Sequence, residues 1–585
     1  MPTAGTSGPI SLATPYGSAT SAADFFVVPS GKTATDIGYT GRIVPDGADL
    51  VVSLGTANKL GLIVFNATRG QTLRLIVSPV SFASGTVSVY SPWGVQIATG
   101  PISTAVGGQT LLLNAVPTTG TYTIRLDVGA NTGSATFSLK TAIAVALGTS
   151  TPVNLTRTLE SGAFTFTTTA GQWVGMGISG LTTAPAGGQA VVSIFSASGK
   201  SMAGVAPLAC TYFYAPGGRC AARNLPAGTY TVFITPQSAN TASMTLTLTA
   251  DATGTLTANS GSQLFNATLV GQAGHYNFNV TSTTQHLTVV GTGSNFTSNP
   301  VFVYVLKPLP DGTQFGGTLA VGTSGNTLDL TNFPVTGTYY AYVAPTGTDL
   351  GHVTIALTQD DSNTITAGGS SLPINLAAGQ NGRYTFTTTG QWVSLAISSL
   401  SFTPSTGSEN LTASVYNSSN TVVSSAAPLN CPYFIYAPGG RCAARNLPAG
   451  NLPAGTYTLV IDPQSVWAAS MTLTLSSDVS GSLTVNGSSQ TFTATRLWQT
   501  ADYSFSVPAG QSYKMLWSGS TFPSSSAIYV LKPDGTSQGV AFIDNGAQAS
   551  GTLNLGTLST AGTYYVYIVP YQTSSGQVTV RVTNP

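Results

Sequence analysis

Residues 214–228 read YAPGGRCAARNLPAG, and residues 436–450 repeat the same stretch without a change. The two copies, which include Cys220 and Cys442, begin 222 residues apart. An identity of this length indicates a duplicated unit, so the chain reads as an array of repeats. Because the copies preserve structural residues and no candidate catalytic ones, they favour a protein that builds or binds something over one that catalyses a reaction.

A second motif, Gly-Thr-Tyr, gives the period of this array. Its tyrosine recurs at spacings of 108, 109, 118 and 107 residues. The five copies end at Tyr122, Tyr230, Tyr339, Tyr457 and Tyr564. Each copy opens an alternation of apolar and polar residues, which is typical of a half-buried strand. The period therefore predicts five units, each the size of a small domain.

The units are of two types. The third and fifth share YVLKP at 304–308 and 529–533, and the first keeps a weaker form of it. The second and fourth carry the cysteine segment, so the order is B-A-B-A-B, with the cysteine units as type A. The predicted boundaries are an N-terminal arm at 1–47 and units at 48–143, 144–250, 251–361, 362–477 and 478–585.

Periodicity indicates an all-β protein. Apolar residues alternate with Thr and Ser, as in MTLTL at 244–248, and no stretch shows a helical period. Turns every 8–12 residues or so and units near 100 residues predict a tandem array of five antiparallel β-sandwiches of jelly-roll or immunoglobulin-like type. Aromatic residues at positions i and i+2 are predicted to lie in the cores: Phe164, Phe166, Tyr276, Phe278, Tyr384, Phe386, Tyr503 and Phe505.

The charge content restricts the class of partner. Only 6% of the residues are Asp, Glu, Lys or Arg, and the formal net charge is +1. No apolar run has the roughly 18–20 residues that cross a bilayer, so no membrane span is predicted. The scattered basic residues do not form the footprint of a nucleic-acid protein. Low charge removes much of the repulsion between copies, which favours self-association, and the predicted partner is the chain itself in a head-to-tail homopolymer.

The four cysteines fall into two local pairs. Cys210 with Cys220, and Cys431 with Cys442, occupy matching places in the two type A units, which predicts one disulfide in each. Zinc would need four ligands, and neither unit contains a histidine, so no metal is predicted. Disulfides favour an oxidising compartment, which places the protein outside the cell or on its surface. The first residues show neither the basic region nor the apolar region of a signal peptide, which leaves the export route open.

Residues able to carry chemistry are few. All three histidines, His275, His286 and His352, fall in the third unit, where alternation places them on the surface. Glu160 and Glu409 lie in separate units, so they do not form the carboxylate pair of a glycosidase. The Asp-Asp pair at 360–361 lies between two units and is interpreted as a solvated linker, with a calcium contact as the alternative. We predict no catalytic residues and no cofactor, and we expect that the chain is not an enzyme.

Three short motifs together resemble a known family. They are the GTYT or GTYY strand, the upstream aromatic strand followed by GQ-V, and the LKPDGT turn at 531–536. The set is similar to the bacterial pre-peptidase C-terminal type of β-sandwich and to related tandem modules of large secreted bacterial proteins, over residues 50–585. The resemblance implies an extracellular, jelly-roll-like domain that serves as a spacer, an adhesive or a substrate-binding appendage. Some relatives bind calcium through acidic clusters, which this chain lacks.

Two functions fit these observations. The first is a structural subunit of a bacterial surface filament, sheath or layer. In this hypothesis the arm at 1–47, which matches no repeat, donates a strand to the sheet edge of a neighbouring copy. The alternative is an adhesin or carbohydrate-binding stalk, in which uncharged faces and exposed tryptophans bind surface glycans: Trp93, Trp467 and Trp498.

Overall fold

A computed structural model describes residues 7–202, 210–237, 241–297, 300–390, 393–423, 434–443, 453–523, 526–570 and 575–585. Across these residues the regular structure consists of strands and one turn of 3-10 helix, η1 (Ala34–Asp36). The all-β prediction is therefore confirmed. None of the helical structure in the described ranges is long and apolar enough to cross a membrane.

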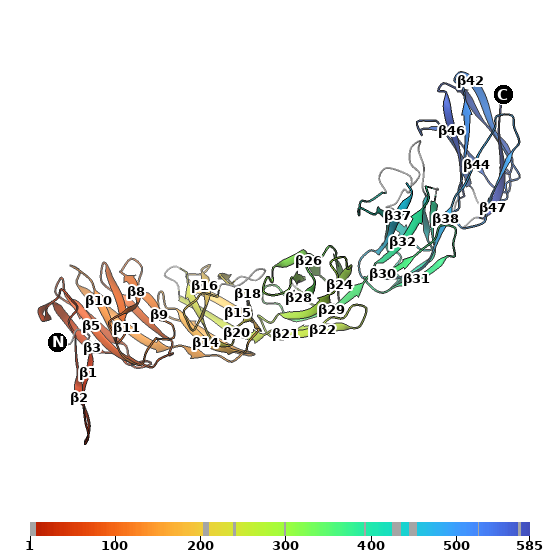
Figure 1. The fold of residues 1–585 in the computed structure, drawn as a ribbon. Helices are drawn as coiled ribbons and strands as arrows, with labels where there is room; N and C mark the ends of the chain where they lie inside the picture. Colours follow the sequence, from red (N-terminus) through yellow and green to blue (C-terminus); the bar gives the residue numbers. More distant parts are fainter. Residues whose placement is uncertain are drawn as a thin grey trace.

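Five two-sheet units follow one another along the chain, preceded by a separate hairpin (Figure 1). Units 1 to 3 lie in a row, and units 4 and 5 continue at an angle to that row. The hairpin consists of β1 (Gly8–Thr14) and β2 (Gly17–Phe25). The strands of unit 1 are β3 (Ile37–Arg42), β4 (Leu50–Leu54), β5 (Leu60–Ala67), β6 (Leu73–Val80), β7 (Gly85–Tyr90), β8 (Gln96–Ile102), β9 (Gln109–Leu113), β10 (Gly120–Asp127) and β11 (Gly133–Thr141).

Units 2 and 3 repeat the same nine strands. The strands of unit 2 are β12 (Ile143–Ala144), β13 (Thr149–Leu155), β14 (Gly162–Thr168), β15 (Gln172–Ala184), β16 (Gln189–Ser196), β17 (Tyr212–Tyr214), β18 (Gly217–Leu225), β19 (Gly228–Pro236) and β20 (Thr241–Ala250). The strands of unit 3 are β21 (Ala252–Thr255), β22 (Ser262–Ala267), β23 (Gly274–Val280), β24 (Leu287–Thr292), β25 (Val301–Leu306), β26 (Gln314–Val321), β27 (Asn326–Leu330), β28 (Gly337–Ala344) and β29 (Gly351–Gln359).

Units 4 and 5 complete the array. The strands of unit 4 are β30 (Asp361–Thr364), β31 (Leu372–Leu376), β32 (Gly382–Thr388), β33 (Val393–Thr403), β34 (Asn410–Asn417), β35 (Phe434–Tyr436), β36 (Gly440–Ala443), β37 (Gly455–Pro463) and β38 (Ala468–Ser477). The strands of unit 5 are β39 (Val479–Ser482), β40 (Gln490–Ala494), β41 (Ala501–Val507), β42 (Gln511–Ser518), β43 (Ser526–Leu531), β44 (Ser537–Ile543), β45 (Gly551–Leu558), β46 (Gly562–Val569) and β47 (Gly576–Thr583).

The strand order is the same in every unit. In unit 1 the five-stranded sheet runs β3-β5-β10-β7-β8 and the four-stranded sheet runs β4-β11-β6-β9, and the other units repeat this order. The first strand of each unit pairs in parallel with the third, as β12 does with β14, and the other ladders are antiparallel. Because the last strand of one unit leads through one residue into the first strand of the next, the chain crosses from unit to unit without a flexible linker.

The core of each unit lies between its two sheets and explains the Gly-Thr-Tyr motif. The tyrosine is buried and stacks on a phenylalanine of the neighbouring strand, as Tyr122 does on Phe65 with ring centroids 5.3 Å apart. Its hydroxyl donates a hydrogen bond to the carbonyl four residues earlier, as from Tyr339 to Val335 over 2.9 Å. All five motif tyrosines make this bond. The eight aromatic residues predicted at i and i+2 are all buried, so that prediction is confirmed.

The cysteine prediction is confirmed where the structure describes it. A disulfide joins Cys210 to Cys220, and both residues are buried in the core of unit 2. Cys431 lies outside the described residues, as does the side chain of Cys442.

The stretch predicted as an N-terminal arm, 1–47, contains two different parts. Strand β3 pairs with β5 and belongs to unit 1. The hairpin β1–β2 forms a two-stranded sheet of its own and projects away from the array (Figure 1). An ion pair between Asp24 and Arg42 ties the end of β2 to β3.

Candidate functional site: the junctions between units

Single residues join the units. Ala142, Asp251, Asp360 and Asp478 stand between the last strand of one unit and the first strand of the next. Burial raises the pKa of all three aspartates, to about 7 for Asp478. Three of the four junctions thus contain a carboxyl group that water does not fully solvate, which requires specific partners in the neighbouring units.

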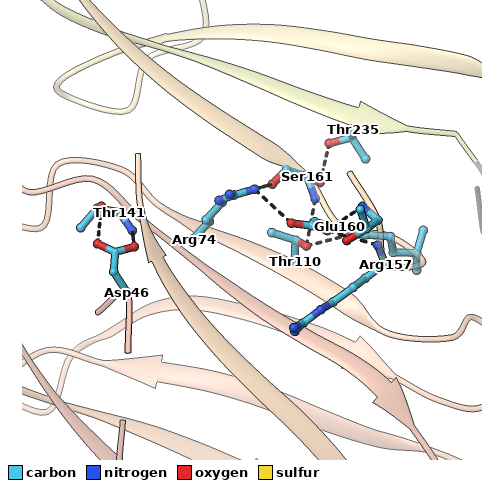
Figure 2. A network of polar contacts seen from close by, with 10 residues as sticks. Asp46, Arg74, Thr110, Thr141, Arg157, Glu160, Ser161 and Thr235 are labelled. Atoms are coloured by element: carbon cyan, nitrogen blue, oxygen red, sulfur yellow. Dashed lines mark hydrogen bonds and ion pairs between the residues drawn. The ribbon is translucent and has the colours of Figure 1, made fainter. Parts of the chain in front are cut away.

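The first junction is a network of polar contacts between units 1 and 2 (Figure 2). Arg74 of β6 donates a hydrogen bond to the Ser161 carbonyl over 2.7 Å and lies 3.5 Å from a carboxylate oxygen of Glu160. The Thr110 hydroxyl donates to the Leu159 carbonyl and accepts from the Ser161 amide. The loop before β14 is therefore fixed to the outer face of the four-stranded sheet of unit 1.

The second junction is packed with aromatic rings. Trp173 stacks on His275 with centroids 4.3 Å apart and contacts Tyr340 and Tyr342 of β28. One hydrophobic cluster joins units 2 and 3: Trp173, Ala221, Ala273, Leu306, Tyr342 and Ala344. The two backbones also approach closely, because a Cβ on Gly177 would overlap the backbone of Val270.

Charged groups are buried beside these rings. Asp251 is fully buried 3.6 Å from His275, and the Arg223 guanidinium lies over the ring of Trp173. Arg219 donates hydrogen bonds to the carbonyls of Gly347, Gln272 and Asp349, and burial lowers its pKa to about 10. The second junction is therefore a filled interface in which one arginine satisfies the carbonyls of three loop residues.

The fifth unit matches a family. Residues 499–570 match the family described as bacterial pre-peptidase C-terminal domain. Unit 5 is similar to this domain. The match covers the GTYY strand and the LKPDGT turn, so the resemblance inferred from these motifs is confirmed for this unit.

Other comparisons add little. No curated protein matches the chain. Similar solved structures include the periplasmic inhibitor of g-type lysozyme PliG from Aeromonas hydrophila (16% identity, 18% of this chain and 99% of that chain, TM-score 0.13). They also include an archaeal virus structure described by its triple jelly roll fold and turret assembly (12% identity, 60% and 88%, TM-score 0.16) and tripeptidyl peptidase 2 (7% identity, 75% and 32%, TM-score 0.15). At these TM-scores the likenesses support no conclusion about the chain.

The third junction contains a cavity of about 270 Å³ between units 3 and 4. On the unit 3 side lie His286, directly before β24, and Asp329 of β27. Asp360 links the units, and Arg383 of β32 and Asp462 of β37 come from unit 4. The complete lining is His286, Leu287, Thr288, Asp329, Thr331, Asp360, Asn381, Arg383, Thr412, Ser414, Tyr416, Asn420, Val460 and Asp462.

Hydrogen bonds orient the three carboxylates of the cavity. Arg383 donates to Asp360 over 2.6 Å, which forms an ion pair across the link. Asp329 accepts from the Thr288 hydroxyl at 2.7 Å and from the Asn381 amide at 3.0 Å, so it joins the two units. Asp462 accepts from the Gln464 side chain at 3.0 Å.

The electrostatics of the cavity follow from this arrangement. Burial, with the nearby Asp329 and Asp360 carboxylates, raises the pKa of Asp462 to about 6. Burial and the Arg383 guanidinium lower the pKa of His286 to about 4, so this imidazole is neutral at neutral pH. The lining thus contains three carboxylates and one guanidinium.

The fourth junction is closed by hydrogen bonds. Asp478 accepts from the Ser394 hydroxyl at 2.9 Å and from the hydroxyl and amide of Thr500. Arg496 donates to the carbonyls of Gly368 and Gly369 in unit 4. Burial raises the pKa of Asp502 to about 6. Each junction therefore uses its own set of side chains on a common backbone plan.

The structure corrects several interpretations of single residues. His275 lies on the outer face of its sheet, but unit 2 covers that face, so its assignment to the surface was wrong. His286 lines the cavity, and His352 lies at the opposite end of β29 from the third junction. Asp360 is ion-paired and its side chain is 7% exposed, so the solvated-linker interpretation was wrong for this residue. Within the described ranges, no group of three or more His, Cys, Asp or Glu residues is placed to hold a metal ion.

The remaining candidates are separated along the array. Glu160 and Glu409 accept hydrogen bonds from backbone amides of their own loops. Trp93 is exposed, whereas Trp467 packs against the core of unit 4 and Trp498 is half-buried. Of the three tryptophans predicted to bind glycans, Trp93 is therefore the one that is exposed as expected.

Of the titratable residues that line the cavity, the sequence pointed to His286 and Asp360 but not to Asp329, Arg383 or Asp462. Asp462 stands five residues after its motif tyrosine, where the other units carry Asp127, Thr235, Ala344 and Val569. Because unit 1 also carries an aspartate there, this position alone does not distinguish the third junction, and the charged lining forms only together with Asp329 and Arg383 from other strands.

Proposed function

We propose that the chain is an extracellular structural protein, a subunit of a bacterial surface filament, sheath or layer whose copies join through β contacts. The observation that carries the proposal is the projecting hairpin β1–β2. A two-stranded hairpin alone is marginally stable in water, and among the described residues no third strand pairs with either outer edge of this one. Ile10 and Leu12 on β1 and Tyr16 at the turn are exposed on it.

The array itself supports a structural role. Each two-sheet unit has the same strand order and its own hydrophobic cluster, from which we infer that each is an independent β-sandwich domain. Buried junctions with one-residue links hold the spacing between neighbours, as a rod requires. A single unit produced alone, such as residues 478–585, should then show one cooperative unfolding transition in calorimetry.

The compartment and the absence of catalysis belong to the same proposal. The Cys210–Cys220 disulfide favours an oxidising environment, and similarity of unit 5 to the pre-peptidase C-terminal domain agrees with secretion. The proposal includes the expectation that the chain is not an enzyme.

Unit 5 offers a surface to which the hairpin of another copy can add. Strand β44 is the edge of its five-stranded sheet, and Val540 and Phe542 on this strand are exposed. Pairing of β1 or β2 with β44 would satisfy the edge of β44 and one outer edge of the hairpin and would bury apolar side chains of each copy, in the manner of β-strand addition. The hairpin and β44 belong to opposite ends of the array, so this pairing gives head-to-tail polymers.

The test is a deletion of residues 1–31, which removes the hairpin and keeps β3 in unit 1. Negative-stain images of the full chain at physiological salt should show filaments, and the shortened chain should give separate rods of unchanged secondary structure. A Phe542→Lys variant should reduce assembly at the other end, whereas Trp93→Lys, a change at an exposed residue of unit 1, should leave it intact. Filaments that persist in the shortened chain would contradict the proposal.

A further inference from the structure

The cavity at the third junction is not explained by a spacer role. Protein interiors are close-packed, and the second junction, at the same place in the fold, is filled by side chains. The third junction instead contains a partly open cavity of about 270 Å³, which is large enough to hold several water molecules or a small ligand. Polar groups line this space from both units, so the cavity can hold a polar ligand through hydrogen bonds.

The charges of the lining are not balanced. Asp360 is neutralised by Arg383, whereas the hydrogen bonds that Asp329 and Asp462 accept from the described residues come from neutral groups. His286 supplies no positive charge at neutral pH, because burial lowers its pKa to about 4. A partly enclosed site with two uncompensated carboxylates is complemented by a ligand that brings a positive charge.

The remaining lining indicates that the ligand also carries hydroxyl groups. Neutral donors and acceptors surround the carboxylates: Thr331, Thr412, Ser414, Tyr416 and Asn420. The Nδ1 atom of His286 is buried and has no hydrogen-bond partner among the described residues. Such groups recognise a hydroxyl-bearing ligand through several hydrogen bonds and discriminate against an analogue that lacks them.

An open groove of about 600 Å³ continues from the cavity. The two share His286, Arg383 and Asn420, and the groove is lined further by small polar side chains: Ser362, Asn363, Thr364, Thr385, Asn417, Ser418 and Thr458. A ligand that fills the cavity can therefore extend along the surface as a chain.

We propose that this cavity and groove bind a saccharide chain that carries a primary amine. Its ammonium group lies in the cavity beside Asp329 and Asp462, and the adjoining rings place their hydroxyls along the groove. A metal ion is a poorer fit, because the described residues include no group of three side chains placed to ligate one. The site is independent of assembly through the hairpin, so either proposal can hold without the other.

The first experiment compares three trisaccharides by calorimetric titration of the full chain at pH 6.5. The glucosamine trimer carries hydroxyls and amines, the N-acetylglucosamine trimer has its amines blocked, and maltotriose has hydroxyls alone. We expect the glucosamine trimer to bind at least about tenfold more tightly than either comparator. Equal affinity for maltotriose, or no binding of the glucosamine trimer at millimolar concentration, would overturn the proposal.

Two variants locate the site. Asp462→Asn removes a charge with little change of shape and should weaken binding of the glucosamine trimer about tenfold or more. The matched control is Asp502→Asn, which changes a buried carboxyl at the fourth junction and should leave the affinity unchanged. Equal losses in both variants would show that binding is elsewhere, and circular dichroism of each variant establishes that it is folded.

The pH dependence gives a further check. Asp462 faces Asp329, Asp360, Arg383 and His286 across the cavity, and its pKa is raised to about 6. Lowering the pH from 6.5 to 5 protonates this carboxyl while the sugar amine stays charged, so the affinity should fall. The decrease should be smaller in Asp462→Asn, and an affinity that rises over this window would contradict the assigned role.

Discussion

The second and third junctions occupy the same place in the fold and differ in what fills them. Each has an aspartate as its link, Asp251 in one and Asp360 in the other. Trp173 and His286 occupy equivalent positions in units 2 and 3. Each directly precedes the residue that pairs with the last residue of its unit's final strand. The smaller imidazole leaves space that the indole fills.

The residues around these two rings also differ between the two junctions. Ala221, which pairs with Gly175, corresponds to Asp329, which pairs with Thr288. Other corresponding pairs across the two junctions are His275 with Arg383, Tyr342 with Val460, and Ala344 with Asp462. At these positions the second junction therefore has aromatic and small apolar side chains that fill the interface, and the third has mainly charged side chains around a cavity.

The strand topology of the array therefore determines where the units meet, and the outward side chains determine what lies between them. The repeated strand order brings the outer face of one four-stranded sheet against the five-stranded sheet of the next unit at both places. A few outward residues determine whether that contact is filled by side chains or contains a cavity. Outward residues of a β-sheet are free to vary while the inward ones preserve the fold.

The largest expected effect comes from breaking the second junction at its closest backbone approach. In Gly177→Val, the new side chain would overlap the backbone of Val270, and backbone cannot move aside as a side chain can. We expect a loss of about 3 kcal/mol or more of junction stability. Small-angle scattering should show a wider range of angles between units 2 and 3, with faster proteolysis near Asp251.

The control for this variant is Gly322→Val in unit 3, where an added Cβ meets no atom within 4 Å. It should leave the scattering profile and the proteolysis rate unchanged. An unaltered profile for Gly177→Val would mean that the close approach does not hold the two units together.

A second change gives the second junction the ring of the third. Trp173→His removes most of the stack on His275 and the contacts with Tyr340 and Tyr342. By comparison with other large-to-small core changes, we expect a loss of about 2–3 kcal/mol at this junction. Hydrogen exchange of the β21 amides measures the loss, and Trp93→His at an exposed position should change the exchange by less than about 0.5 kcal/mol.

The sequence was sufficient for the features that depend on local periodicity. Alternation along single strands identified the all-β class and the buried pair Phe166 and Phe164, and the Gly-Thr-Tyr spacing gave the repeat. Two matching cysteines gave the Cys210–Cys220 disulfide. These predictions hold because each concerns residues close together in one unit, where the strand period determines the inward face.

The junctions were beyond the same reasoning. Alternation shows that His275 is opposite Tyr276, but it cannot show that another unit covers that outer face. In the same way, Asp329 and Asp462 are 133 residues apart, and only the stacking of units 3 and 4 brings them into one cavity. Burial by a neighbouring unit leaves no period of its own in the sequence.

A third change converts the third junction into the type of the second. His286→Trp should place an indole in the cavity, since Trp173 occupies the corresponding position. Filling the cavity should abolish binding of the glucosamine trimer and stabilise the junction by about 1–2 kcal/mol. Calorimetric titration and hydrogen exchange of the β30 amides measure the two effects. Retained binding together with unchanged exchange would show that the ring does not enter the cavity.

The smallest expected effect is a dependence of the third junction on pH. The pKa of Asp462 is raised to about 6 in the folded protein from a usual value near 3.8, so between about pH 4 and pH 6 the folded state binds more protons than the unfolded state. The stability of the junction should therefore fall as the pH rises through this window and level off above it. Because Asp462 is only partly buried, we expect a change of about 1 kcal/mol. Hydrogen exchange of the β30 amides, compared at each pH between the full chain and its Asp462→Asn variant, isolates this group. The variant should lack the decrease, whereas a difference between the two proteins that favours the full chain at high pH would reverse the sign and contradict the assignment.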